Sequence, residues 1–341
     1  MPARWTKCWE RSAGLDSVIK LKVYLLLFVV VEAAFAQEPT FRSQSNIVIV
    51  PALVRAVSGH PIYGLHAGDF VIEDDGVGQE LQLDESAEAE PLSLVVAIQT
   101  GRRAWREFGR VQGLSSMLAP ILDQPDTQIA VLAFDSRLNL AQDFTSEGPQ
   151  IANCLHNLPA GDHGAAILDA VQYSVRLLDK APQVRQKVLL LISETRDHGS
   201  HFAKIDDVVT LIGNSTTTVY TLVFSPTISN ILDTERGNNQ DEMNATVDLI
   251  ALLAHARAAM KSNTPKAIAS QTGGEYELFG SRKRFETRMM DFTNHLRNRY
   301  VLSFEPKNPR PGLHQIRVRL KDPGTATVLA RSSYWAAGPA Q

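Results

Sequence analysis

Apolar residues recur along this chain in two patterns: short unbroken runs, and runs interrupted by polar turn residues. The unbroken runs lie between residues 91 and 280, where stretches with helical spacing separate them. Such runs are typical of strands buried on both faces of a parallel sheet. We expect strands at 94–98, 128–134, 187–192, 218–224 and 275–279. The helices expected between them include 109–122, 167–180 and 248–261, so the region predicts a doubly wound α/β sheet.

The flanks of this region have a different pattern. At 46–83, β-branched runs are bounded by turn residues such as Asp74-Asp75-Gly76, which predicts antiparallel hairpins. After Arg299 the chain returns to strand-like runs punctuated by prolines. Neither flank has enough strands to bury a sheet face alone, so we expect 46–83 and 299–341 to share one small β-sandwich. The expected domains are a signal peptide at 1–36, a β segment and acidic linker at 37–90, an α/β domain at 91–298 and a β segment at 299–341.

The first 36 residues have the pattern of a leader. Basic residues precede an apolar run at 23–31, and Ala34-Phe35-Ala36 fits the small-x-small rule for cleavage before Gln37. The alternative is an uncleaved anchor, but the run is short for a span of ~20 residues. We expect export to the cell envelope, the periplasm or the medium, without a membrane span after cleavage.

Composition narrows the function classes. Hydrophobic residues make up 44% of the chain and charged residues 21%, with a formal net charge of −3. These values describe an ordinary globular chain and give no electrostatic case for binding nucleic acid. The chain has no nucleophile elbow, no His-Glu-x-x-His and no phosphate-binding loop, so we expect neither enzymatic activity nor a cofactor. Cleavage would remove Cys8, and Cys154 fits a buried structural thiol on an amphipathic helix.

Three loops should meet at the carboxyl ends of the strands, the edge where α/β sheets usually hold their ligands. We call this edge the lip and define it as residues 99–105, 161–166 and 193–202. The loops contain Gln99-Thr100-Gly101-Arg102-Arg103, then Gly164-Ala165-Ala166, then Ser193-Glu194-Thr195. With these loops, residues 91–280 resemble a von Willebrand factor A domain.

A second likeness spans nearly the whole chain after the leader. It is carried by 64–76 before the A-like region, 269–274 near its end, and 300–306 after it. In this order the stretches are similar to the secreted A-domain-related proteins described mainly from acidobacteria. The resemblance implies an α/β domain beside a β-sandwich, which agrees with the hydrophobic pattern.

The same resemblance implies where a metal ion would bind. The A-domain family holds a divalent cation with the three polar residues of an Asp-x-Ser-x-Ser motif in the first loop, a Thr in the second loop and an Asp in the third. The matching positions in this chain are Gln99, Gly101, Arg103, Ala165 and Glu194. Only Glu194 is a carboxylate, although hard dications require oxygen ligands. We therefore expect a degenerate adhesion site without a metal.

Two features of the lip leave alternatives open. Either Arg102 or Arg103 pairs with Glu194 in place of the ion, or both arginines point into water. Trp105 beside Arg102 would suit a protein contact. Imidazoles and carboxylates in the second and third loops could also converge on a transition metal, although solvated loop histidines are far commoner. Those side chains are Asp162, His163, Asp197, His198 and His201.

Two function classes follow. The first is an exported, non-enzymatic protein-binding or adhesion module. The second is a structural or assembly component of the cell envelope, in which the A-like domain is a scaffold for the sandwich. A lip with exposed anchor residues favours the first class, and a large apolar patch on the sandwich favours the second.

Overall fold

The computed structural model describes residues 47–84, 91–101, 104, 113–182, 185–224, 249–307 and 310–336. The expected leader and three predicted lip residues lie outside these ranges, as does a stretch at 225–246 that is rich in Asn and Asp. The three are Arg102, Arg103 and Trp105. Within the described residues no helix has the length and apolar character needed to cross a lipid bilayer.

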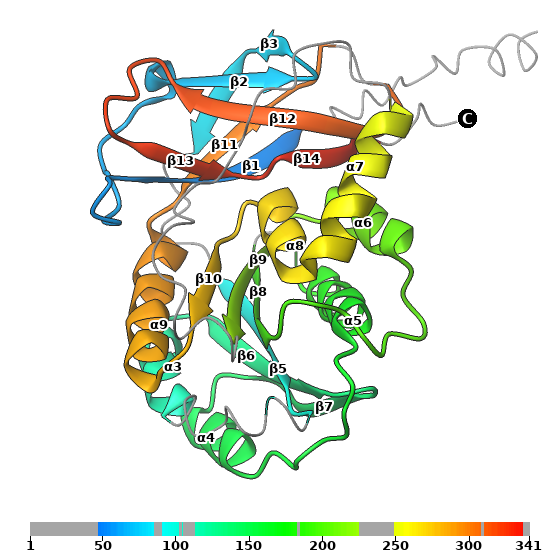
Figure 1. The fold of residues 1–341 in the computed structure, drawn as a ribbon. Coiled ribbons are helices and arrows are strands. Elements are labelled where there is room, and N and C mark those ends of the chain that lie inside the picture. The colour runs from blue at the N-terminus through cyan, green and yellow to red at the C-terminus, as the bar shows by residue number, and fades with distance from the viewer. Residues whose placement is uncertain are drawn as a thin grey trace, which may run out of the picture. The chain divides into compact units, whose positions relative to one another are not determined.

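A six-stranded sheet forms the centre of the α/β region, with strand order β10-β9-β8-β5-β6-β7 (Figure 1). Neighbouring strands are parallel except for the edge strand β7, which runs antiparallel to β6. The prediction of a mostly parallel doubly wound sheet is therefore confirmed. The strands are β5 (Leu92–Gln99), β6 (Thr127–Phe134), β7 (Leu138–Thr145), β8 (Gln186–Ser193), β9 (Thr218–Phe224) and β10 (Tyr276–Phe279).

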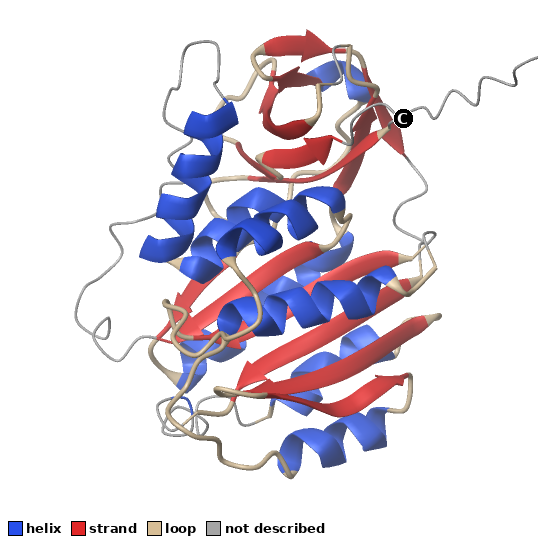
Figure 2. Cartoon of the chain, turned by 90° about the vertical axis from the view of Figure 1, so that its right-hand side faces the viewer, coloured by secondary structure: helices blue, strands red, loops and turns tan. Residues whose placement is uncertain are grey.

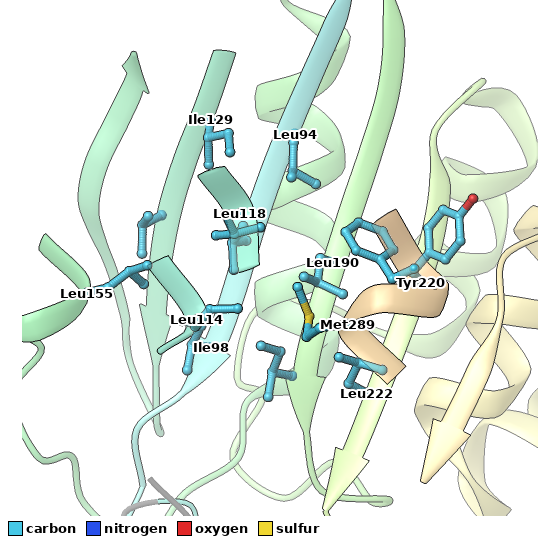
Figure 3. Packing of buried hydrophobic residues seen from close by; sticks show 14 of the residues in the cluster. Leu94, Ile98, Leu114, Leu118, Ile129, Leu155, Leu190, Tyr220, Leu222 and Met289 are labelled. Carbon is cyan, nitrogen blue, oxygen red and sulfur yellow. The ribbon is translucent and has the colours of Figure 1, made fainter. Parts of the chain in front are cut away.

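Helices cover both faces of this sheet, which explains why its central strands have unbroken apolar sequences. Leu94, Val96 and Ile98 of β5 pack with α3 (Leu114–Leu122), α4 (Gly148–His156) and α9 (Arg282–Arg297). Figure 3 shows this core, with Leu118 and Met289 over the strands. The alternate residues of β5, Val95 and Ala97, pack on the other face. That face is covered by α5 (Ile167–Asp179), α6 (Ile205–Asn214), α7 (Leu249–Ser262) and α8 (Thr264–Thr272).

Helix α8 begins and ends at residues that favour those positions. The side chain of Asn263 accepts a hydrogen bond from the backbone N–H of Lys266 at 3.1 Å, which caps the first turn. Pro265 lies in that turn, where its missing N–H costs nothing. The helix ends at Gly273, whose φ of 78° is in the left-handed region that favours glycine.

The flanking segments form two four-stranded antiparallel sheets that enclose a common core (Figure 2). Each sheet takes strands from both ends of the chain, so the sandwich in the predicted fold class is confirmed. One sheet has the order β13-β1-β11-β4, and the other has the order β14-β12-β2-β3. Their strands are β1 (Val48–Arg55), β2 (Phe70–Asp74), β3 (Val77–Gln79), β4 (Leu81–Asp84), β11 (Tyr300–Phe304), β12 (Gly312–Leu320), β13 (Thr327–Ala330) and β14 (Ser333–Ala336), with a short 3-10 turn η1 (Ala67–Asp69).

The expected hairpin at Asp74-Asp75-Gly76 is confirmed, because this turn joins β2 to the antiparallel strand β3. The apolar runs that begin at Ile47 and Leu53 instead contribute to a single strand, β1, which continues through Pro51. Proline is tolerated there because Pro51 pairs with Val301 on one side only, and the pairing with β13 on the other side begins at Ala52. The missing N–H therefore leaves no ladder bond unmade.

Arg331 joins the sandwich to the α/β region. Its guanidinium is buried and donates to the carbonyls of Ile212, Gly213 and Ser215 at the end of α6, at 3.1–3.3 Å. These carbonyls are the negative end of a helix dipole and partly replace a carboxylate partner. Burial nevertheless lowers the pKa of Arg331 to about 10.

A second buried contact adjoins it. Glu275 accepts hydrogen bonds from Arg55 of β1 at 3.0 Å and from His295 of α9 at 2.9 Å. Glu275 immediately precedes β10, and the residues held by Arg331 precede β9. The sandwich therefore contacts the amino ends of these parallel strands, which leaves the lip at their carboxyl ends.

Candidate functional site

The lip is organised around Gln99, the last residue of β5. Its side chain is 2% exposed, and its Oε1 accepts a hydrogen bond of 3.0 Å from the backbone N–H of Glu194. The two residues meet because β5 and β8 are parallel neighbours in a register that aligns Ile98 with Ile192. A side-chain amide thus ties together the tips of the two central strands.

Gly101 occupies a position where no side chain fits. A Cβ built there would lie 2.6 Å from the carbonyl oxygen of Gly164 and 3.2 Å from that of Asp162. The second loop is held this close in part because the N–H of Gly161 donates to the carbonyl of Thr100 at 2.8 Å. The A-domain family has a ligand serine at this position. In this chain, backbone carbonyl groups of the second loop occupy the space that such a side chain would need.

Ala165 is fully buried and belongs to the core under α5. Its N–H and carbonyl form a pair of hydrogen bonds with His198, at 2.9 and 3.0 Å. The second loop is thereby paired with the third. The methyl group of Ala165 supplies no oxygen to a cation.

Glu194 is the one carboxylate that the sequence placed in the ligand set, and it is 8% exposed. Its Oε1 contacts Nε2 of His198, which lies at position i+4 in the same loop. The carboxylate is therefore engaged by an imidazole of its own loop. The predicted pairing of Glu194 with Arg102 or Arg103 concerns arginines outside the described residues.

Asp162 shapes the second loop. Its carboxylate accepts hydrogen bonds from the N–H of Ser136 at 3.1 Å and of Gly164 at 2.7 Å, and it also contacts the Ser136 hydroxyl. The Ser136 hydroxyl and then the Gly164 N–H hold the pKa of Asp162 below its usual value. The carboxylate therefore joins the second loop to the turn that follows β6, and these hydrogen bonds account for it as a structural group.

Asp169, in the first turn of α5, anchors the third loop. Its buried carboxylate accepts hydrogen bonds from three successive N–H groups, those of His201, Phe202 and Ala203, at 2.9, 3.1 and 2.6 Å. With its backbone fixed in this way, Phe202 presents a side chain that is 83% exposed. Phe202 is not among the contact residues predicted from the sequence, although it is the one aromatic residue in the polar stretch 194–202.

The histidines of the lip do not gather into a metal site. Nδ1 and Nε2 of His163, His198 and His201 form no group of three ligating atoms with neighbouring carboxylates. His198 contacts Glu194, and Asp197 accepts from the N–H of Leu168 at 3.0 Å and from the Ser200 hydroxyl at 2.6 Å. In the described part of the chain one such group exists elsewhere, at Asp74, Asp75 and His314 of the sandwich.

The described lip residues do not fit a hard dication. Such an ion needs several oxygen ligands converging at 2.0–2.6 Å. Here the amide oxygen of Gln99 is turned to a backbone N–H, the side chain of Ala165 has no oxygen, and a side chain at Gly101 would clash with the carbonyl of Gly164. The arrangement fixes three loops by direct hydrogen bonds instead.

Cys154, on α4, is half-buried and packs at the margin of the core between the sheet and α3, α4 and α9. Burial raises the pKa of its thiol. A raised pKa lowers the thiolate fraction, so this cysteine is a poor nucleophile.

Comparison with known families and curated proteins finds no matching family model and no matching curated protein. Solved structures give weak similarities. The von Willebrand factor domain of the type V pili tip protein Mfa5 from Porphyromonas gingivalis is 14% identical, with a TM-score of 0.29 over 32% of this chain and 39% of that one. Proximal thread matrix protein 1 from the mussel byssus, with a zinc-occupied MIDAS motif, is 13% identical, with a TM-score of 0.43 over 66% of this chain and 50% of that one.

A von Willebrand factor type A protein from Catenulispora acidiphila is 10% identical, with a TM-score of 0.44 over 87% of this chain and 75% of that one. This chain spans 39% of the length of the pilus-tip protein and half that of the mussel protein. Because all three TM-scores lie below 0.5, the fold class rests on the strand order described above.

Proposed function

We propose that this chain is an exported, non-enzymatic protein-binding module whose lip works without a metal ion. The observation that carries the proposal is the closure of the lip by the chain's own groups. The Gln99 amide holds the Glu194 backbone, and the Gly164 carbonyl fills the space beside Gly101. These contacts fix the three loops that a cation joins in the A-domain family, which the chain resembles.

The proposed binding surface is the outer face of the third loop. Phe202 is an exposed aromatic residue on a backbone held by Asp169, and aromatic residues are frequent anchors of protein interfaces. A loop that is already fixed loses little conformational entropy when a partner binds. Arg102 and Trp105 remain contacts that are proposed from the sequence alone.

Capture of partners from the native cell envelope on the immobilised mature chain tests the proposal. We expect capture to be equal in Mg²⁺ and in a chelator, and to be lost in Phe202→Ala. Met290→Ala is the matched control, because Met290 is 64% exposed on α9, which covers the opposite face of the sheet from α5. Capture that requires Mg²⁺, or that Phe202→Ala leaves unchanged, would refute the proposal.

Thermal unfolding tests whether the lip binds a metal ion, and this measurement requires no binding partner. A ligand that binds the native state alone adds about 2.7 kcal/mol of stability at a hundredfold excess over its Kd. We expect millimolar Mg²⁺ or Mn²⁺ to cause no shift in thermal unfolding that depends on Glu194. A rise that disappears in Glu194→Ala would show that a cation still binds at the lip.

Export is the part of the proposal that rests on the leader. Its basic start, apolar run and Ala34-Phe35-Ala36 site support cleavage before Gln37. N-terminal sequencing of the exported protein tests this, and residues found ahead of Ala36 would contradict it.

The alternative function, an assembly component of the envelope, has one observation in its favour. Several large apolar side chains of the sandwich segments are exposed: Ile47, Ile49, Val57, Tyr63 and Val77. If the sandwich carries the interface, Val57→Ser and Tyr63→Ser abolish the capture described above and Phe202→Ala does not.

A further inference from the structure

The second sheet of the sandwich buries a polar cluster that the proposed function does not use. Asp74 ends β2 opposite Ile316 of the antiparallel strand β12, and His314 lies two residues along β12 on the same face. Asp75 follows in a tight turn, with a φ of 47°. His314 is 2% exposed and Asp74 is 4% exposed, so the fold has placed ionisable groups where apolar ones are the rule.

The atoms of this cluster point toward one another. Nδ1 of His314 lies 3.1 Å from Oδ1 of Asp74 and 3.1 Å from Oδ2 of Asp75. Its Nε2 lies 2.7 Å from the carbonyl oxygen of Arg310. A carbonyl only accepts, so Nε2 carries a hydrogen and Nδ1 is the nitrogen whose lone pair can bind a cation.

Outer hydrogen bonds hold the two carboxylates in place. The hydroxyl of Tyr334 donates to Oδ2 of Asp74 at 3.0 Å, and the N–H of Gln315 donates to Oδ1 of Asp75 at 2.9 Å. Each carboxylate therefore keeps its other oxygen directed at His314. A ligand set whose remaining polar atoms are fixed by a second layer of donors is characteristic of metal sites.

The cluster also favours positive charge at its centre. Oδ1 of Asp74 and Oδ2 of Asp75 both face Nδ1 of His314, and two carboxylates directed at one point attract a cation. The guanidinium of Arg310 also donates to Oδ2 of Asp75 at 2.8 Å, but its side chain is 67% exposed and can leave that oxygen.

We propose that Asp74, Asp75 and His314 bind a transition-metal dication, with Zn²⁺ the best match, through Oδ1, Oδ2 and Nδ1 respectively. One imidazole and two carboxylates are ordinary zinc ligands, and water would complete a four-coordinate site. Binding displaces the proton on Nδ1 to solvent, and the two carboxylates balance the charge of the ion. This site shares no residue with the lip. The experiments below therefore test it independently of the proposal that the lip works without a metal ion.

Titration of the metal-stripped mature chain tests the site, with Zn²⁺ followed by calorimetry and Co²⁺ followed by its visible absorption. We expect one equivalent of each metal to bind and the Co²⁺ bands to be those of a four-coordinate nitrogen and oxygen site. Asp75→Asn and His314→Gln should each weaken the binding of Zn²⁺ by about 100-fold or more. His198→Gln is the matched control, because it removes a histidine from the lip and should leave the titration unchanged.

Tyr334→Phe distinguishes a loss of metal binding from a loss of folding. It removes only the hydroxyl that positions Asp74, and we expect it to weaken Zn²⁺ binding by about 10-fold. If the wild-type chain binds no equivalent of Zn²⁺ or Co²⁺, or if Asp75→Asn and His314→Gln bind as the wild type does, the cluster is a structural hydrogen-bond network and the proposal is wrong.

Discussion

The side-chain oxygen of Gln99 lies 3.0 Å from the backbone nitrogen of Glu194 and accepts its hydrogen bond. This one contact joins the tips of β5 and β8, which in the A-domain family supply two of the groups that hold a cation. An aspartate at this position would direct a negative charge at the neighbouring Glu194 carboxylate. The neutral amide instead joins these two strand ends by a direct hydrogen bond.

Gln99→Ala should lower the free energy of unfolding by about 2 kcal/mol, because it leaves the buried N–H of Glu194 without that acceptor. Urea denaturation measures the change. Gln142→Ala is the control: the Gln142 amide, on the edge strand β7, donates to the carbonyl of its neighbour Asp143, and the substitution should stay within about 0.5 kcal/mol. Equal effects of the two substitutions would show that the Gln99 bond contributes little.

Restoring the family's serine at Gly101 should damage the fold. A Cβ at Gly101 would lie 2.6 Å from the Gly164 carbonyl, so the second loop must shift, and we expect Gly101→Ser to cost about 3 kcal/mol. Gly68→Ser is matched to it, because a Cβ at Gly68 has no atom within 4 Å. Thermal unfolding of both variants checks this, and a Gly101→Ser chain as stable as Gly68→Ser would mean that the lip is loose enough to accept a ligand.

Arg331→Met should loosen the sandwich from the α/β region. The substitution leaves the carbonyls of Ile212, Gly213 and Ser215 without their shared donor, and we expect a loss of about 3 kcal/mol. Arg319→Met is the comparison: its pair with Glu73 lies at the surface, where such pairs contribute about 0–1 kcal/mol. Hydrogen exchange should also show faster exchange at β14 in Arg331→Met. Wild-type protection there would contradict the role given to Arg331.

The hydrophobic pattern predicted the central sheet because strands covered on both faces have unbroken apolar sequences, as β5 and β8 do. It missed β7, whose half-buried residues show neither a clean alternation nor an apolar run. The pattern also split β1 at Pro51, because a sequence does not show which side of a strand lacks a partner.

The candidate site divides in the same way. Gln99 and Glu194 follow directly from two predicted strand ends, so their meeting was predictable. The closure at Gly101 depends on how a loop some sixty residues later folds back, and Phe202 depends on the three hydrogen bonds to Asp169. The cluster around His314 joins residues 240 positions apart through a strand register that no local signal gives.

Glu275 should make the stability of this chain depend on acid pH. Burial alone would raise its pKa, but the hydrogen bond from His295 and the charges of His295, Arg299 and Arg55 together lower it from the ordinary 4.5. A carboxyl whose pKa is lower in the folded state stabilises the fold above its unfolded pKa, and this contribution is lost as the pH falls through the folded pKa. Glu275→Gln should therefore be less stable than the wild type at neutral pH.

Urea unfolding at pH 7 and at roughly pH 3 measures this difference. We expect the gap between wild type and Glu275→Gln to be about 1–3 kcal/mol at pH 7 and to shrink toward zero in acid. Glu277→Gln is the matched control with the opposite sign, because burial raises the pKa of Glu277 and its ionised form costs stability at neutral pH. If the difference in unfolding free energy between wild type and Glu275→Gln is the same at both pH values, the contribution of Glu275 comes from packing, because packing does not titrate. The charges of Arg55 and His295 beside Glu275 would then add no net stability.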